Sequence, residues 1–88
     1  MFVRGKRNLM KVQVLFFGAT AEAVGEREIE IDLEAKANAA AAFEQIISVY
    51  PNLQKHALLF AVNQEYSDVD KIIKDGDEIA IFTAVSGG

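Results

Sequence analysis

The residues with the clearest chemical potential are Gly87 and Gly88, which end this 88-residue sequence. Glycine has no Cβ atom, so a Gly-Gly segment can thread a narrow channel and adopt backbone angles that are closed to other residues. A terminal carboxylate on such a segment is unhindered, and it becomes reactive once it is converted to an acyl-adenylate. If a sulfur donor then displaces the adenylate, the product is a C-terminal thiocarboxylate. The chain would then carry a transferable sulfur atom.

Two simpler interpretations of the Ser86-Gly87-Gly88 segment stay open. It resembles a linker fragment left by cloning, and it would also fit a polar tail without a role. Its position favours a function, because it follows directly on the strand expected at 78–85. A rigid body would then project the glycines into solvent.

Side-chain chemistry is scarce elsewhere, since the sequence has no cysteine and a single histidine, His56. A disulfide framework, a thiolate zinc site and a cysteine nucleophile are therefore excluded. We expect His56 to be a surface histidine, and we expect no bound metal or cofactor. The balance of 9 Lys+Arg against 13 Asp+Glu argues against general nucleic-acid binding. Function is expected to reside in a surface or in the chain end.

Positive charge is concentrated at the start of the sequence, in Arg4, Lys6, Arg7 and Lys11. A signal peptide is one interpretation, but the apolar stretch that follows is shorter than the usual ~7–15 residues. We favour residues 1–9 as a flexible extension, with Met10 as an alternative start. The longest apolar run, 57–62, is too short to span a membrane, so a membrane is not an expected partner and the cytoplasm is the expected compartment.

Hydrophobic periodicity predicts several strands and one main helix. Strict alternation at 27–33 is typical of a half-buried strand, and spacing of i, i+3, i+4 and i+7 at 38–50 is typical of a helix. Asn38 is the expected N-cap of that helix, and Pro51 ends it. The other expected elements are a strand at 11–17, a small-residue loop with one helical turn at 18–25, a buried strand at 57–62, a turn at 63–65, a polar segment with a short strand at 66–74, a turn at 74–77 and a strand at 78–85.

The first and last strands are the most apolar on both faces, so we expect them to lie centrally and side by side. One helix would then cover one face of the sheet. This arrangement is an α+β roll of the β-grasp kind, a mixed sheet of four to five strands with one main helix. The domain is expected to span 10–85, followed by the tail at 86–88.

Phe17 and Phe82 lie on the more polar side of their strands, so we expect both to be exposed. Aromatic residues dominate interface anchors, which favours a docking surface. The alternative is that they pack under a loop or on the N-terminal extension.

Two acidic groups could have a role of their own. Glu28, Glu30 and Asp32 could bind a hard cation, but an ordinary solvated face is the favoured interpretation. Asp75, Asp77 and Glu78 could steer a basic partner, although an ordinary polar turn is slightly favoured.

The sequence resembles the ubiquitin-like sulfur carriers, most closely those that act as the small subunit of molybdopterin synthase. The resemblance covers residues 10–88. The matching stretches are MKVQVLFFG at 10–18, VGE at 24–26, VYPNL at 49–53, AVNQEY at 61–66, DGDEIAIF at 75–82 and VSGG at 85–88. Two departures are residues 1–9, which lie outside the pattern, and Thr83-Ala84, where the family commonly has prolines. Without prolines the tail is expected to be looser and more costly to order.

The resemblance implies a function in molybdenum cofactor biosynthesis. A ubiquitin-activating-like enzyme would use ATP to adenylate Gly88, and a sulfurtransferase would convert it to the thiocarboxylate. The tail, with Val85, Ser86 and Gly87, would enter the large subunit of a heterotetrameric synthase. There it would donate sulfur to cyclic pyranopterin monophosphate and form the molybdopterin dithiolene. The resemblance also places Phe17, Tyr66 and Phe82 on the apolar docking surface.

Two other functions stay open for the same tail. The first is a sulfur carrier for thiamin or another thio-compound. The second is a ubiquitin-like protein modifier or interaction module. In each case the chain acts through partners rather than as a catalyst alone.

Overall fold

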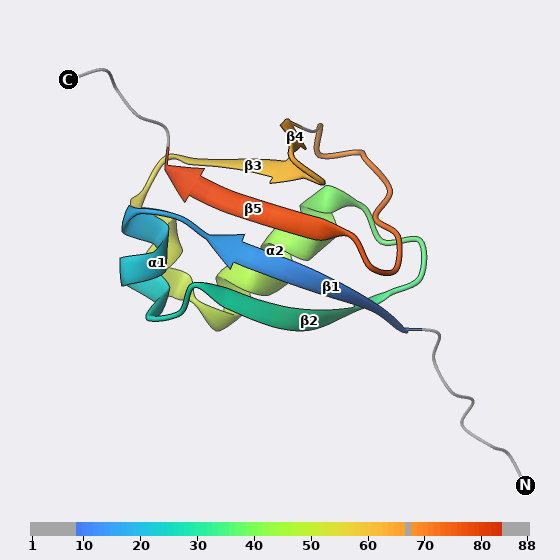
Figure 1. Ribbon diagram of the computed structural model, residues 1–88, viewed down its shortest axis with the longest axis horizontal. Helices are drawn as coiled ribbons and strands as arrows, with labels where there is room; N and C mark the ends of the chain where they lie inside the picture. Colours follow the sequence, from blue (N-terminus) through green and yellow to red (C-terminus); the bar gives the residue numbers. More distant parts are fainter. Residues whose placement is uncertain (1–8, 67, 84–88) are drawn as a thin grey trace, which may run out of the picture.

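The computed structural model describes residues 9–66 and 68–83 (Figure 1). Val85 and the tail residues Ser86, Gly87 and Gly88 lie outside this range, as do residues 1–8. The elements along the chain are β1 (Leu9–Phe16), α1 (Ala19–Val24), β2 (Glu28–Glu34), α2 (Ala39–Val49), the 3-10 helix η1 (Pro51–Lys55), β3 (Leu58–Val62), β4 (Glu65–Tyr66) and β5 (Glu78–Thr83). Because β1 begins at Leu9, that residue belongs to the sheet rather than to the expected extension.

The five strands form one mixed sheet in the order β2-β1-β5-β3-β4. β1 and β5 pair in parallel at its centre, and every other neighbouring pair is antiparallel. Figure 1 shows these two central strands side by side and pointing the same way. The expected central position of the first and last strands is confirmed, and so is the β-grasp architecture.

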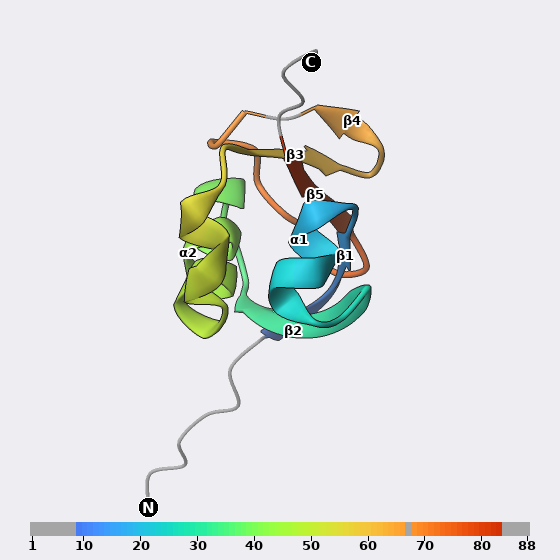
Figure 2. The same ribbon diagram turned by 90° about the vertical axis from the view of Figure 1, so that its left-hand side faces the viewer.

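One face of the sheet is covered by α2, as the edge-on view in Figure 2 shows. Buried Ala39 and Ala42 are small enough to let the helix approach the sheet closely. Asn38 is its N-cap, since the side-chain oxygen accepts a hydrogen bond from the amide of Ala41 at 2.9 Å. The core between the two layers contains Met10, Val12, Val14, Phe16, Leu33, Ala39, Ala42, Ile46, Leu53, Val62, Ile73, Ile79 and Ile81.

The segment at 18–25 differs from the expected loop with one turn, because it forms the six-residue helix α1. Gly18 precedes the helix with φ 60° and ψ −128°, a conformation that is essentially restricted to glycine. Gly25 ends it in the left-handed region with φ 84°. Helix α1 contacts both η1 and β5, so it closes one end of the core.

The apolar run at 57–62 was expected to be a buried strand, and this is only partly correct. Ala61 and Val62 are buried in β3, but Leu59 is 39% exposed. Successive side chains of a strand point to opposite faces, and α2 covers only one of them. A continuous apolar run therefore places some of its residues on the uncovered face.

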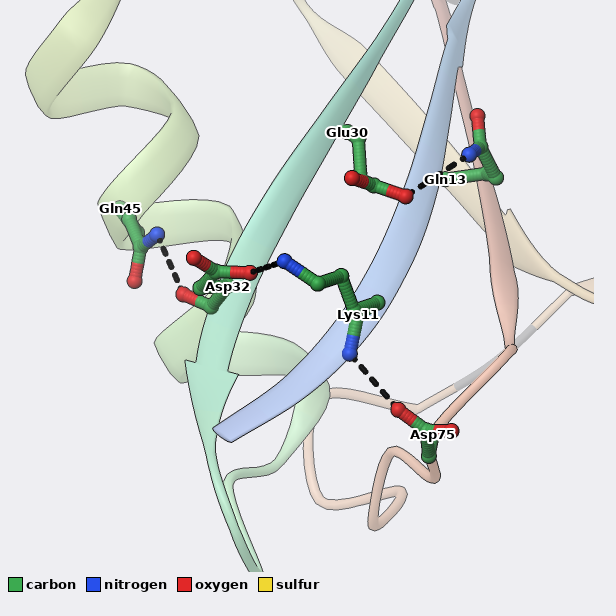
Figure 3. Close-up of polar contacts among 6 residues, drawn as sticks. All are labelled: Lys11, Gln13, Glu30, Asp32, Gln45 and Asp75. Atoms are coloured by element: carbon green, nitrogen blue, oxygen red, sulfur yellow. Dashed lines mark hydrogen bonds and ion pairs between the residues drawn. The ribbon is translucent and has the colours of Figure 1, made fainter. Parts of the chain in front are cut away.

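Gln45 of α2 reaches the outer edge of β2, where its side-chain amide donates a hydrogen bond of 2.9 Å to the Asp32 carbonyl (Figure 3). This bond fixes α2 to the edge of the sheet. Within the described residues, no helix is both long and apolar enough to cross a membrane.

The packing of α2 predicts that Ile46→Ala lowers the free energy of unfolding by about 2–5 kcal/mol, because Ile46 is buried between helix and sheet and its loss leaves a cavity. Urea unfolding followed by circular dichroism measures this change. Val49→Ala on the same helix is the matched control, since Val49 is 60% exposed and should cost no more than about 0.5 kcal/mol. Equal effects of the two changes would contradict the packing described here.

Candidate partner-docking face

The candidate site is the face of the sheet that points away from α2. No helix of the described residues covers it (Figure 2). Its side chains are those that alternate with the core residues along each strand. They are Lys11, Gln13 and Leu15 of β1, Glu28, Glu30 and Asp32 of β2, Leu59 and Ala61 of β3, Tyr66 of β4, and Glu78, Ala80 and Phe82 of β5.

The strand register divides this face into a polar end and an apolar end. At the polar end, Gln13 lies between Glu30 of β2 and Glu78 of β5. Two residues further along β1, Leu15 lies beside Ala80. The face therefore becomes apolar toward the end of β5.

Three residues from three strands form the centre of the apolar end. The rings of Tyr66 and Phe82 lie 5.9 Å apart between centroids, tilted by 57°. Leu59 is the cross-strand partner of Phe82. Tyr66 is 74% exposed and Leu59 is 39% exposed, so these side chains meet solvent rather than a protein layer. Such an arrangement of exposed aromatic and aliphatic groups is typical of a protein-binding site.

Phe17 extends the apolar end on the other side of β5. Its amide donates a hydrogen bond of 3.1 Å to the Ile81 carbonyl, which continues the pairing of Phe16 with Ile81. Its side chain is 51% exposed. The expected exposure of Phe17 is confirmed, whereas Phe82 is only half-buried, because the Tyr66 ring lies against it. We refer to Phe17, Leu59, Tyr66 and Phe82 as the apolar patch.

Sequence reasoning found three members of the apolar patch and missed Leu59. No sequence signal marked Leu59, because 57–62 is apolar on both sides; the structure packs Leu58 and Phe60 against the core and leaves Leu59 exposed. The expected tail contacts Val85, Ser86, Gly87 and Gly88 lie outside the described residues, so the site consists here of the patch beside the end of β5 at Thr83.

The polar end of the face is organised by Lys11 (Figure 3). Its ammonium lies 3.0 Å from a carboxylate oxygen of Asp32, and its amide donates to the Asp75 carboxylate at 2.8 Å. The side-chain amide of Gln13 donates to the Glu30 carboxylate at 3.5 Å. Among the described residues, no group of three or more His, Asp or Glu residues could hold a metal ion. The solvated face is therefore the interpretation that the geometry supports for Glu28, Glu30 and Asp32.

The carboxylates of Asp75 and Asp77, in the turn before β5, both accept hydrogen bonds from other groups of the protein. The Asp77 side chain accepts hydrogen bonds from the Asn63 side-chain amide at 2.9 Å and from the Lys74 backbone amide at 2.8 Å. The Glu78 amide donates to the Asn63 side-chain oxygen at 3.0 Å. These bonds support the interpretation of this segment as an ordinary polar turn.

His56 does not join the apolar patch. It is half-buried at the end of η1. It lines a hollow of about 440 Å³ between η1 and α2, on the side of the molecule away from the patch. The expectation of a surface histidine is therefore partly correct, since His56 is half-buried rather than fully exposed.

Asp32 raises the pKa of the Lys11 ammonium above its usual value, first through the hydrogen bond and then through charge attraction. A raised pKa in the folded state means that the pair stabilises the fold below the ordinary lysine pKa, and that this contribution disappears as the pH rises through the raised value. We predict that Asp32→Asn lowers the pKa of Lys11, measured by NMR titration of the lysine side chain. Glu28→Gln is the control and should leave the titration unchanged.

Three comparisons with known proteins bear on this site. Residues 14–88 match the profile of the ThiS family. A molybdopterin synthase sulfur carrier subunit from Chlamydomonas reinhardtii is 39% identical, and the alignment covers 90% of this chain and 100% of that protein.

Solved structures also resemble the chain in three dimensions, among them the following two. SAMP1 from Haloferax volcanii aligns with a TM-score of 0.80 and 24% identity, covering 89% of this chain and 99% of that one. This likeness shows a shared fold. One chain of the complex of subunits 1 and 2 of molybdopterin-converting factor from Helicobacter pylori 26695 aligns with a TM-score of 0.63 and 29% identity, covering 90% of this chain and 100% of that one.

Proposed function

Because the chain belongs to the ThiS family, we propose that it is a sulfur carrier and the small subunit of a molybdopterin synthase. The observation that carries this proposal is the exposed apolar patch, which lies on the uncovered sheet face beside the end of β5. A partner bound to that patch would be close to the segment that leads to Gly88. The relative from Chlamydomonas reinhardtii, named as a molybdopterin synthase sulfur carrier subunit, favours this pathway.

The proposed chemistry occurs at the carboxylate of Gly88. That carboxylate attacks the α-phosphorus of ATP on an adenylating enzyme, and pyrophosphate leaves. A sulfurtransferase then presents a persulfide, whose outer sulfur displaces AMP and forms an acyl disulfide. A thiol cleaves that disulfide by exchange and releases the thiocarboxylate. No side chain of the described body is needed for any of these steps, which agrees with the absence of cysteine from the sequence. The cytoplasm is the proposed compartment for this cycle.

The proposed acceptor reaction takes place on a large subunit. The Helicobacter pylori structure is a complex of two subunits, and one of its chains has this fold. By analogy, the apolar patch would dock on the large subunit while the tail enters its active site. The thiocarboxylate would transfer its sulfur there to cyclic pyranopterin monophosphate, building the dithiolene. Each dithiolene needs two sulfur atoms, so the carrier must dissociate and be recharged.

Two other functions would use the same tail. A thiamin-type sulfur carrier would share the thiocarboxylate but would not bind a large synthase subunit. A protein modifier would be joined through Gly88 to lysine side chains of other proteins. The likeness to SAMP1 is at 24% identity and shows the fold alone, so it does not favour the modifier.

Charging of the tail can be read directly from the mass of the intact protein. In a host with the charging system, a fraction of the protein should be about 16 Da heavier, because sulfur replaces one oxygen. Removal of Gly88 should abolish this species. If the adenylating enzyme, ATP and a sulfur donor produce no heavier species, the sulfur-carrier proposal is wrong.

Docking through the apolar patch predicts that Phe82→Glu weakens binding to the large subunit at least a hundredfold, since it places a charge at a desolvated aromatic anchor. Isothermal titration calorimetry with the purified subunit measures this. Val49→Glu is the matched control, because it adds the same charge at an exposed apolar residue of α2, away from the patch. Unchanged binding of the Phe82 variant would exclude the patch as the docking surface.

A further inference from the structure

Thr20 of α1 is fully buried, and among residues 9–66 and 68–83 it is the one buried polar residue. Its hydroxyl oxygen accepts a hydrogen bond from the Phe17 amide at 3.0 Å. The hydroxyl also donates toward two carbonyls, that of Phe17 at 2.7 Å and that of Ile81 at 2.9 Å, which share its single hydrogen. One side chain therefore connects α1, the end of β1 and β5.

Both residues held by this hydroxyl belong to the apolar end of the docking face. Phe17 is itself a member of the apolar patch. Ile81 immediately precedes Phe82, and Thr83 is the last residue of β5. From inside the core, Thr20 thus bonds to the backbone at both patch aromatics, at Phe17 just after β1 and at Ile81 just before Phe82.

We refer to the place where Phe17, Thr20 and Ile81 meet as the corner. Backbone hydrogen bonds already connect these residues without the hydroxyl. The Phe17 amide donates to the Ile81 carbonyl at 3.1 Å, and the Thr20 amide donates to the Phe17 carbonyl at 3.2 Å. The hydroxyl therefore gives the Phe17 and Ile81 carbonyls a hydrogen-bond donor in addition to these backbone amides. Burying a hydroxyl is unfavourable unless it is bonded, and threonine is a weaker helix former than alanine. The main effect of the Thr20 hydroxyl is therefore to restrict the geometry of the corner, rather than to make folding possible.

We propose that Thr20 is a positioning residue for partner docking. It holds Phe17 at a fixed position relative to β5, so that Phe17 and Phe82 meet the partner with the required spacing. This inference rests on the proposed docking function. Loss of the hydroxyl would let the corner move, and the partner would have to restrict that motion on binding.

The test compares three variants in their binding to the purified large subunit. Thr20→Val keeps the shape but removes the hydroxyl, and it should raise the Kd about tenfold, the effect of one buried hydrogen bond. Thr20→Ser keeps the hydroxyl and should restore binding. Ile46→Val is the stability control, because Ile46 lies in the core under α2 and not at the patch. It should lower the Tm without changing the Kd.

Sulfur transfer separates positioning from a general loss of structure. With the thiocarboxylated carrier as substrate, Thr20→Val should raise the KM for the carrier about tenfold and change kcat less than about twofold. Thr20→Ala serves the same comparison if the valine variant does not fold.

Three outcomes would overturn the inference. If Thr20→Val binds like the unchanged protein while Phe82→Glu does not bind, the docking face stands and the role of Thr20 is wrong. If Ile46→Val weakens binding as much as Thr20→Val at equal loss of Tm, Thr20 is only structural. If neither Thr20→Val nor Phe82→Glu changes the Kd, the proposed docking face fails, and the role of Thr20 fails with it.

Discussion

The parallel pairing of β1 with β5 determines what projects from each face of the sheet. Val14 pairs with Ile79 and Phe16 with Ile81, and all four side chains are buried in the core. Side chains alternate along each strand, so burial of these residues forces Phe82 onto the opposite face. A shift of one residue in the pairing of β5 would turn its core side chains to the uncovered face and its outward side chains to the core. The apolar patch is therefore a consequence of how the core is packed.

Much of this arrangement could be predicted from the sequence because the periodic signals were local. The alternation in β2 and the helical spacing in α2 both reflect burial on one side, and Asn38 marks the start of the helix. The six residues of α1 carried no such signal, because they are too few to show a helical period and are flanked by Gly18 and Gly25. Gly18 and Gly25 supply the backbone conformations at its two ends, and the Thr20 hydroxyl connects it to β5.

The candidate site was predictable in part for the same reason. Phe17 and Phe82 could be placed from the polar residues that share their side of each strand. Leu59 could not, since both sides of β3 are apolar and only the structure shows which side α2 covers. The hydroxyl bonds of Thr20 join residues 61 positions apart in sequence, and no local pattern could indicate them. The resemblance suggested the chemistry at Gly88, and the structure adds the exposed apolar patch beside the end of β5.

The hydrogen bond from Gln45 to the Asp32 carbonyl has a consequence for solubility. β2 is an edge strand, and an open edge is a template on which another chain can add a strand and begin aggregation. Gln45 occupies one acceptor on that edge, and the exposed carboxylates of Glu28, Glu30 and Glu34 repel a second copy placed beside it. The edge is thereby kept from growing into a larger sheet. Under the proposed function, a carrier that binds successive partners would depend on remaining a separate molecule between them.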